Sequence, residues 1–167
     1  MEQPKPLIEG STRADGLRFA LVVSRFNDFV TDRLQAGALE ALEAAGAPGE
    51  HVVVLKVPGA FEIPVAARRA AETGAFDAVI CLGCLIRGAT PHFEYIASAA
   101  AHGITDAAGA TGVPMTFGVL TTNSAEEALE RAGARSANKG WEAAMAAVEM
   151  ATLLRRVRQA APGGIRA

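Results

Sequence analysis

The sequence has few cysteines, few aromatic residues and no excess of positive charge. Two cysteines among 167 residues cannot form a disulfide framework, and a chain of this length buries enough surface to fold as one domain without one. Aromatic residues make up only 5% of the chain. We therefore expect a core of small side chains packed between helices and a sheet.

The charge balance and the apolar runs exclude two classes of partner. The 16 Lys and Arg residues and the 18 Asp and Glu residues give a net charge of −2, with no basic face to neutralise a nucleic-acid backbone. No apolar run approaches the ~20 residues that span a bilayer, and the N-terminus lacks the basic start and apolar core of a signal peptide. We expect a cytoplasmic protein that contacts neither nucleic acid nor membrane.

The two cysteines, Cys81 and Cys84, form a C-x-x-C sequence, a spacing also found in redox and metal sites. They lie in the apolar run AVICLGCLI, which has the pattern of a strand, and residues three apart on a strand point to opposite faces. We therefore interpret both as small buried apolar residues.

Apolar runs of strand type alternate with segments of helical periodicity along the whole chain. The runs cover residues 17–26, 51–57, 77–86 and 115–122. The first helix is expected to be capped by Thr31 and to end at Gly46, and the last to run from about Asn138 to Gln159. Ser124 and Glu127 have the spacing of a capping box before a short helix.

This alternation predicts an α/β fold of the doubly wound, flavodoxin-like type, with a central four-stranded parallel sheet and helices on both faces. We expect one domain over residues 1–167. Residues 1–16 would form an extended N-terminal arm that pairs with a sheet edge, in this chain or in another subunit. Residues 160–167 would form a flexible tail.

Polar clusters follow each predicted strand, where ligands of open α/β sheets bind. The richest is LGCLIRGATPHFEYI, Leu82 to Ile96. Gly88, Ala89 and Thr90 lead directly into a helix, so their backbone N–H groups can bind an anion. The same residues also suit an ordinary helix start, with Thr90 as N-cap and Pro91 first in the helix.

We call the turn from Gly88 to Thr90 the anion seat. His92 is the only histidine beside it, and imidazole exchanges protons near neutral pH. A lone histidine in a first helical turn is more often structural. The nearby Arg87 and the preceding glycine turn bring the functional interpretation level with the structural one.

The ordered segments RFN, PGAFE, LGCLIRGATPHFEYI, FGVLTTN and RAGARSANKGWEAA resemble the lumazine synthase family. The resemblance extends from about Leu17 to Leu154, and the combination of motifs is highly specific. One departure is Ala137, which stands where the family often has a glycine.

The resemblance implies a transferase that condenses 5-amino-6-(D-ribitylamino)uracil with 3,4-dihydroxy-2-butanone 4-phosphate. The product is 6,7-dimethyl-8-ribityllumazine, in the penultimate step of riboflavin biosynthesis, and phosphate and water are released. No cofactor and no metal are implied.

The resemblance also implies a set of site residues. The pyrimidine and ribityl groups would contact Phe26, Ala60, Phe61, Glu62, Cys84, Leu85, Ile86, Phe117 and Lys139. The phosphate would contact Ala89, Thr90 and Arg131, and His92 would transfer protons. Phe117 matches a phenylalanine lent by an adjoining subunit.

The partners implied are two small-molecule substrates and further copies of the chain, as a homopentamer or a pentamer-based icosahedral shell. A functional association with riboflavin synthase is a further implication. The alternatives are a flavin- or lumazine-binding protein, or a shell-forming protein, on the same scaffold.

Overall fold

Four parallel strands form the centre of the computed structural model, which describes residues 1 and 4–160. The strands are β1 (Phe19–Ser24), β2 (Val52–Val57), β3 (Ala78–Ile86) and β4 (Met115–Thr122). They lie in the order β2-β1-β3-β4. Phe19 is paired with Val52 on one side and with Ala78 on the other. The predicted four-stranded parallel sheet is confirmed.

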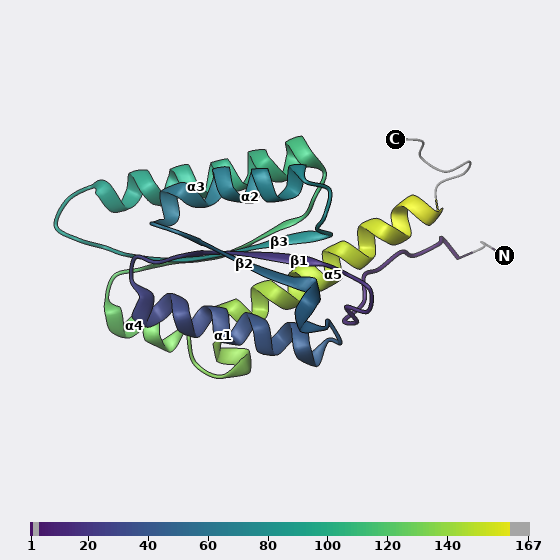
Figure 1. Ribbon diagram of the computed structural model, residues 1–167, viewed down its shortest axis with the longest axis horizontal. Coiled ribbons are helices and arrows are strands. Elements are labelled where there is room, and N and C mark those ends of the chain that lie inside the picture. The colour runs from purple at the N-terminus through teal and green to yellow at the C-terminus, as the bar shows by residue number, and fades with distance from the viewer. Residues whose placement is uncertain (2–3, 161–167) are drawn as a thin grey trace.

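Helices cover both faces of this sheet (Figure 1). One face carries α1 (Asp28–Ala44), α4 (Ala125–Glu130) and α5 (Lys139–Ala160), and the other carries α2 (Ile63–Glu72) and α3 (His92–Thr111). Short 3-10 turns lie at η1 (Gly49–His51), η2 (Ala60–Glu62) and η3 (Arg135–Ala137). Because crossovers place helices on either side, the predicted doubly wound fold is confirmed.

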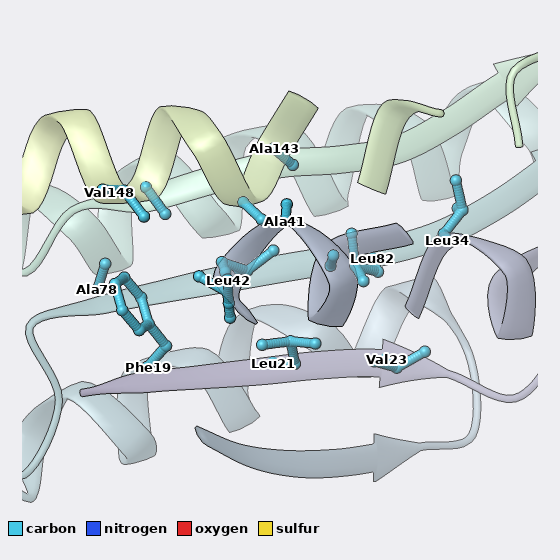
Figure 2. Close-up of a cluster of buried hydrophobic side chains, with 14 of the residues drawn as sticks. Phe19, Leu21, Val23, Leu34, Ala41, Leu42, Ala78, Leu82, Ala143 and Val148 are labelled. Carbon is cyan, nitrogen blue, oxygen red and sulfur yellow. The ribbon is translucent and has the colours of Figure 1, made fainter. Parts of the chain in front are cut away.

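Alternate residues of β1 serve two separate cores. Phe19, Leu21 and Val23 point toward α1 and α5, where Leu42 and Val148 pack on them (Figure 2). Ala20 and Val22 point to the α2 and α3 face. All of these β1 side chains are fully buried, as expected for a parallel strand covered on both faces.

The two cysteines follow the same alternation on β3. Cys81 belongs to the α2–α3 core and Cys84 to the α1–α5 core, and neither forms a disulfide. Burial raises the pKa of Cys81 to about 12 and that of Cys84 to about 11. Both thiols therefore stay protonated and behave as small apolar groups, as predicted.

The start of α1 differs from the sequence prediction. Thr31 was expected to cap the helix, but the helix begins at Asp28 and the Thr31 hydroxyl is buried inside it without a partner. The boundary residue is Asn27, in the left-handed conformation with φ 62°. Asparagine tolerates this conformation, and it turns the chain sharply from β1 into α1.

Two further helix starts can be compared with their predicted caps. Thr90 does not cap α3, because Pro91 is the boundary residue and His92 is the first helical residue. The Ser124 hydroxyl does cap α4, accepting a 3.2 Å bond from the Glu127 N–H. The Glu127 carboxylate accepts from the Asn123 N–H, one residue before the position that a capping box requires.

The N-terminal arm lies beside α5 and pairs with no strand of this chain among the described residues (Figure 1). The Ser11 N–H donates to the Thr152 hydroxyl at 2.8 Å, and Arg156 donates to the Glu9 carbonyl at 2.6 Å. The predicted tail lies, apart from Ala160, outside the described residues. No described helix is long and apolar enough to cross a bilayer.

Candidate functional site

A cavity of about 700 Å³ opens at the carboxyl ends of β1 and β3. Its walls come from the residues after β1, from the η2 turn after β2, from the end of β3 and from the first turns of α3. The predicted site residues that line it are Phe26, Ala60, Phe61, Glu62, Leu85, Ile86, Thr90 and His92. This is the crevice at which ligands bind in open α/β sheets.

Phe26 is held by its backbone and leaves its ring in the open. Its N–H donates to the Pro58 carbonyl at 3.0 Å, and the Arg25 N–H donates to the Val57 carbonyl at 2.8 Å. The ring is 70% exposed at the cavity wall. An aromatic face fixed in this way can stack on a flat heterocycle.

The η2 turn is closed by its own acidic residue. The Glu62 carboxylate Oε2 accepts a 3.0 Å bond from the Gly59 N–H. Ala60 is buried beneath the turn, whereas Phe61 is 62% exposed above it. The turn thus presents one aromatic ring and one carboxylate to the cavity.

A cluster of ionic contacts brackets the anion seat between β3 and α3. Arg87 forms an ion pair with Glu94, and its Nε donates to the Asn123 side chain at 3.0 Å. Its guanidinium also lies 4.6 Å from the centre of the Phe93 ring. The Glu94 pKa lies below its usual value, chiefly because the Arg87 guanidinium donates a hydrogen bond to the Glu94 carboxylate. Arg87 therefore fixes the turn instead of presenting a free cation to it.

His92 follows this turn as the first residue of α3 and is exposed at the cavity. Ala89 is exposed on the same turn but does not line the cavity. Cys84 does not line it either, because its side chain points into the α1–α5 core.

The remaining three predicted residues lie elsewhere on the chain. Phe117, Arg131 and Lys139 line a second groove of about 440 Å³ between the edge strand β4 and α5. The Lys139 ammonium pairs with Glu142 at 2.8 Å, and Arg131 donates to the Glu127 carbonyl at 3.2 Å. The structure thus divides the predicted site into a cavity group and a groove group, which line different hollows of one chain.

Several cavity residues were missed by the sequence analysis. Tyr95 lines the cavity and is 73% exposed, and the available signal in the sequence was an aromatic residue three positions after His92. Phe93 and Ile96 also line it, but their spacing is that of ordinary core residues. Asn27 lines it as well, and its side chain donates to the Cys84 carbonyl at 2.9 Å. This bond ties the end of β1 to β3.

The cavity can hold a flat, partly polar molecule between aromatic rings, with a carboxylate on one side and an imidazole and a helix N-terminus on the other. Within the described part of the chain, no three His, Cys, Asp or Glu side chains are grouped so that they could hold a metal ion.

Comparisons with known proteins agree with these features. A family model described as 6,7-dimethyl-8-ribityllumazine synthase matches residues 16–155. The protein of that name from Syntrophus aciditrophicus is 54% identical over 149 residues, covering 89% of this chain and 97% of the relative. The one from Desulfatibacillum aliphaticivorans is 52% identical over 147 residues, covering 88% and 95%.

Proposed function

Because the chain belongs to the 6,7-dimethyl-8-ribityllumazine synthase family, we propose a division of labour between its cavity and its groove. The chain is a transferase of riboflavin biosynthesis that condenses 5-amino-6-(D-ribitylamino)uracil with 3,4-dihydroxy-2-butanone 4-phosphate. The alternative of a flavin-binding protein is not favoured, since the relatives are named as the enzyme. The proposal concerns which residues act in this reaction.

The cavity group binds the pyrimidine in this proposal. Phe26 stacks on the ring, and Leu85, Ile86 and the Cys84 backbone border its edge. Glu62 accepts hydrogen bonds from the ribityl hydroxyls beside Ala60 and Phe61. The support is the cavity itself, which is lined by the exposed Phe26 ring after β1, by Glu62 after β2 and by the end of β3.

The turn before α3 binds the phosphate of the second substrate. The N–H groups at Ala89 and Thr90 lie at the positive end of a 20-residue helix, which favours an anion. Because Arg87 is engaged by Glu94 and Asn123, the cation for the phosphate has to come from another residue. We assign this role to Arg131, whose planar guanidinium suits a phosphate.

His92 moves the protons. Imine formation between the ketone and the pyrimidine amine releases water, loss of phosphate follows, and ring closure onto the second carbonyl releases a second water. Each step requires a proton to be added or removed at the reacting atoms. His92 is the first residue of α3, directly after the anion seat, and it lines the cavity. Holding both substrates in register supplies much of the remaining acceleration.

Phe117, Arg131 and Lys139 reach the cavity of a neighbouring subunit. The observation that supports this is their position, because all three line the groove on the β4 edge and none lines the cavity. A closed ring with head-to-tail contacts gives every cavity one such neighbour. We propose a homopentamer, alone or within an icosahedral shell. The association with riboflavin synthase and the cytoplasmic location stay predictions.

Mixed oligomers test the shared site. His92→Ala inactivates the cavity group and Arg131→Ala inactivates the groove group, so co-refolding the two chains should place intact His92 beside intact Arg131. Activity should then exceed the sum of the two homomers, with wild-type protein assayed in parallel and assembly checked by sizing. Co-assembled particles with only the averaged activity of the parents would contradict a site made by two chains.

A further inference from the structure

Asn138 is a fully buried amide at the junction between η3 and α5. It is only 3% exposed, and every hydrogen-bonding position of its side chain is used. Its Nδ2 donates to the Arg33 carbonyl at 3.1 Å and to the Gly133 carbonyl at 2.8 Å. Its Oδ1 accepts from the N–H groups of Gly140 at 2.8 Å and Trp141 at 3.1 Å. The side chain therefore links α1, the loop before α5 and the first turn of α5.

Two glycines make room for this amide. A Cβ on Gly37 would lie 2.4 Å from the Asn138 side chain, and a Cβ on Gly140 would lie 2.0 Å from the Leu34 carbonyl oxygen. Both distances are far below contact, so α1 and α5 can approach this closely only at glycine. Asn138 is thus held from three sides without space to shift.

The loop that Asn138 fixes carries both cations of the groove. The Lys139 N–H donates to the Arg131 carbonyl at 2.8 Å, and Ala132 and Asn138 form an antiparallel bridge. Residues 131–139 therefore form a closed loop whose two ends are Arg131 and Lys139. Ala137 suits its position here, because φ is positive within the loop only at Arg135, so glycine is not required.

We infer that Asn138 is a positioning residue that fixes Arg131 in its place for the phosphate-bearing substrate. The inference rests on the proposed function, because it takes Arg131 as the phosphate ligand. Asn138 touches no substrate itself. Arg131 and Lys139 are both exposed, and their side chains are long and flexible, so their backbone positions have to be set by contacts beneath them.

Replacing the Asn138 amide by a carboxylate tests whether the side chain positions Arg131. Asn138→Asp keeps the size and the acceptor oxygen but sets a second oxygen against two carbonyl groups, where Nδ2 had donated. The loop should move away from α1 and carry Arg131 with it. We expect the KM for the butanone phosphate to rise roughly 10- to 100-fold, since displacements of about 1 Å at a site cost this much. The KM for the pyrimidine should rise less than the KM for the butanone phosphate, because most of the predicted pyrimidine contacts line the cavity and not this loop.

A control on the same helix separates positioning from general stability. Thr152 is a buried polar residue that bonds to the N-terminal arm and lies in the half of α5 away from Lys139. Thr152→Val should lower the melting temperature and leave both KM values unchanged. If Asn138→Asp lowers only the melting temperature and the active fraction, as a purely structural residue would, the inference is overturned.

The double variant Arg131→Ala, Asn138→Asp links the effect to Arg131. Its KM for the butanone phosphate should equal that of Arg131→Ala alone, because Asn138 acts through the same residue. If Arg131→Ala itself leaves this KM unchanged, the proposed phosphate site fails. If it raises the KM and Asn138→Asp does not, only the positioning inference fails.

A smaller substitution, Asn138→Ser, covers the case in which the aspartate variant does not assemble. It should show the same selective rise in KM. If neither variant yields assembled protein, Asn138 is required for folding and the positioning role is overturned.

Discussion

The cavity and the groove are both predicted to serve one reaction, but they are built in different ways. In the cavity, several separate contacts set the geometry, among them the Gly59–Glu62 turn, the Arg87–Glu94 pair and the Asn27–Cys84 bond. In the groove, one buried amide ties the loop to α1, about a hundred residues earlier in the chain. The cavity should therefore tolerate local changes, whereas the groove should fail as a unit.

The largest expected effect is on the folded state, in a pair of glycine substitutions. Gly140→Ala forces a methyl group against the backbone of α1, which cannot move aside, so the free energy of unfolding should fall by about 3 kcal/mol or more. Gly88→Ala, in the cavity turn, meets nothing within 4 Å and should cost less than about 1 kcal/mol. Urea unfolding measures both. An equal loss of unfolding free energy in Gly140→Ala and Gly88→Ala would contradict the expected difference between the groove and the cavity.

An intermediate effect is expected at the cavity, on turnover alone. His92→Ala should lower kcat by roughly 10- to 1,000-fold, which is the lower part of the effect expected for one general acid or base. The loss is not complete because the substrates are still held in position. KM values and the unfolding midpoint should stay close to those of the wild type, since His92 is exposed. An unchanged kcat would remove His92 from the mechanism.

The smallest effect concerns the ion pair that brackets the phosphate turn. Arg87 lowers the pKa of Glu94 below its ordinary 4.5, so the ionised pair adds stability above about pH 4.5 and this stability is lost as the pH falls through the folded-state pKa. The melting temperature of Glu94→Gln should therefore be slightly below that of the wild type at pH 7, and the difference should vanish in acid.

The size of this difference is limited because both side chains are about half exposed and the pair is screened by solvent and salt. Glu43→Gln, at an exposed position on α1, is the control. A difference between wild type and Glu94→Gln that persists unchanged at pH 3 would show that the ion pair is not its source.

The sequence predicted most of the fold because periodicity and strand-end composition are local signals. β4 was predicted with its observed bounds, and the cysteines were correctly placed on opposite faces of β3. The start of α1 was not predicted, because it depends on Asn27 bonding to β3, a contact 57 residues away. Local pattern alone favoured Thr31, which instead lies buried in the helix.

The division of the site residues between the cavity and the groove was also not predicted, because it depends on contacts between residues that are far apart in the sequence. The residue types at Phe117, Arg131 and Lys139 follow from the motifs, and the family resemblance had already placed Phe117 in a neighbouring subunit. That Arg131 and Lys139 lie with Phe117 at the β4 edge, and not with His92, follows only from the strand order β2-β1-β3-β4. The role inferred for Asn138 required the contacts with Gly37 and Arg33, which no spacing in the sequence reveals.

The packing of α1 against α5 also bears on how the chain is made. The apolar face of α1 is completed by Ala144 and Val148 of α5, and α5 begins only at Lys139. At the usual ~5–20 residues per second, roughly 5 to 20 s of synthesis separate the two helices. During this interval the nascent chain exposes a helical stripe and the partly covered sheet beneath it. The yield of folded protein in a cell is therefore expected to depend on chaperone occupancy of that stripe and on the speed of the ribosome between codons 45 and 138.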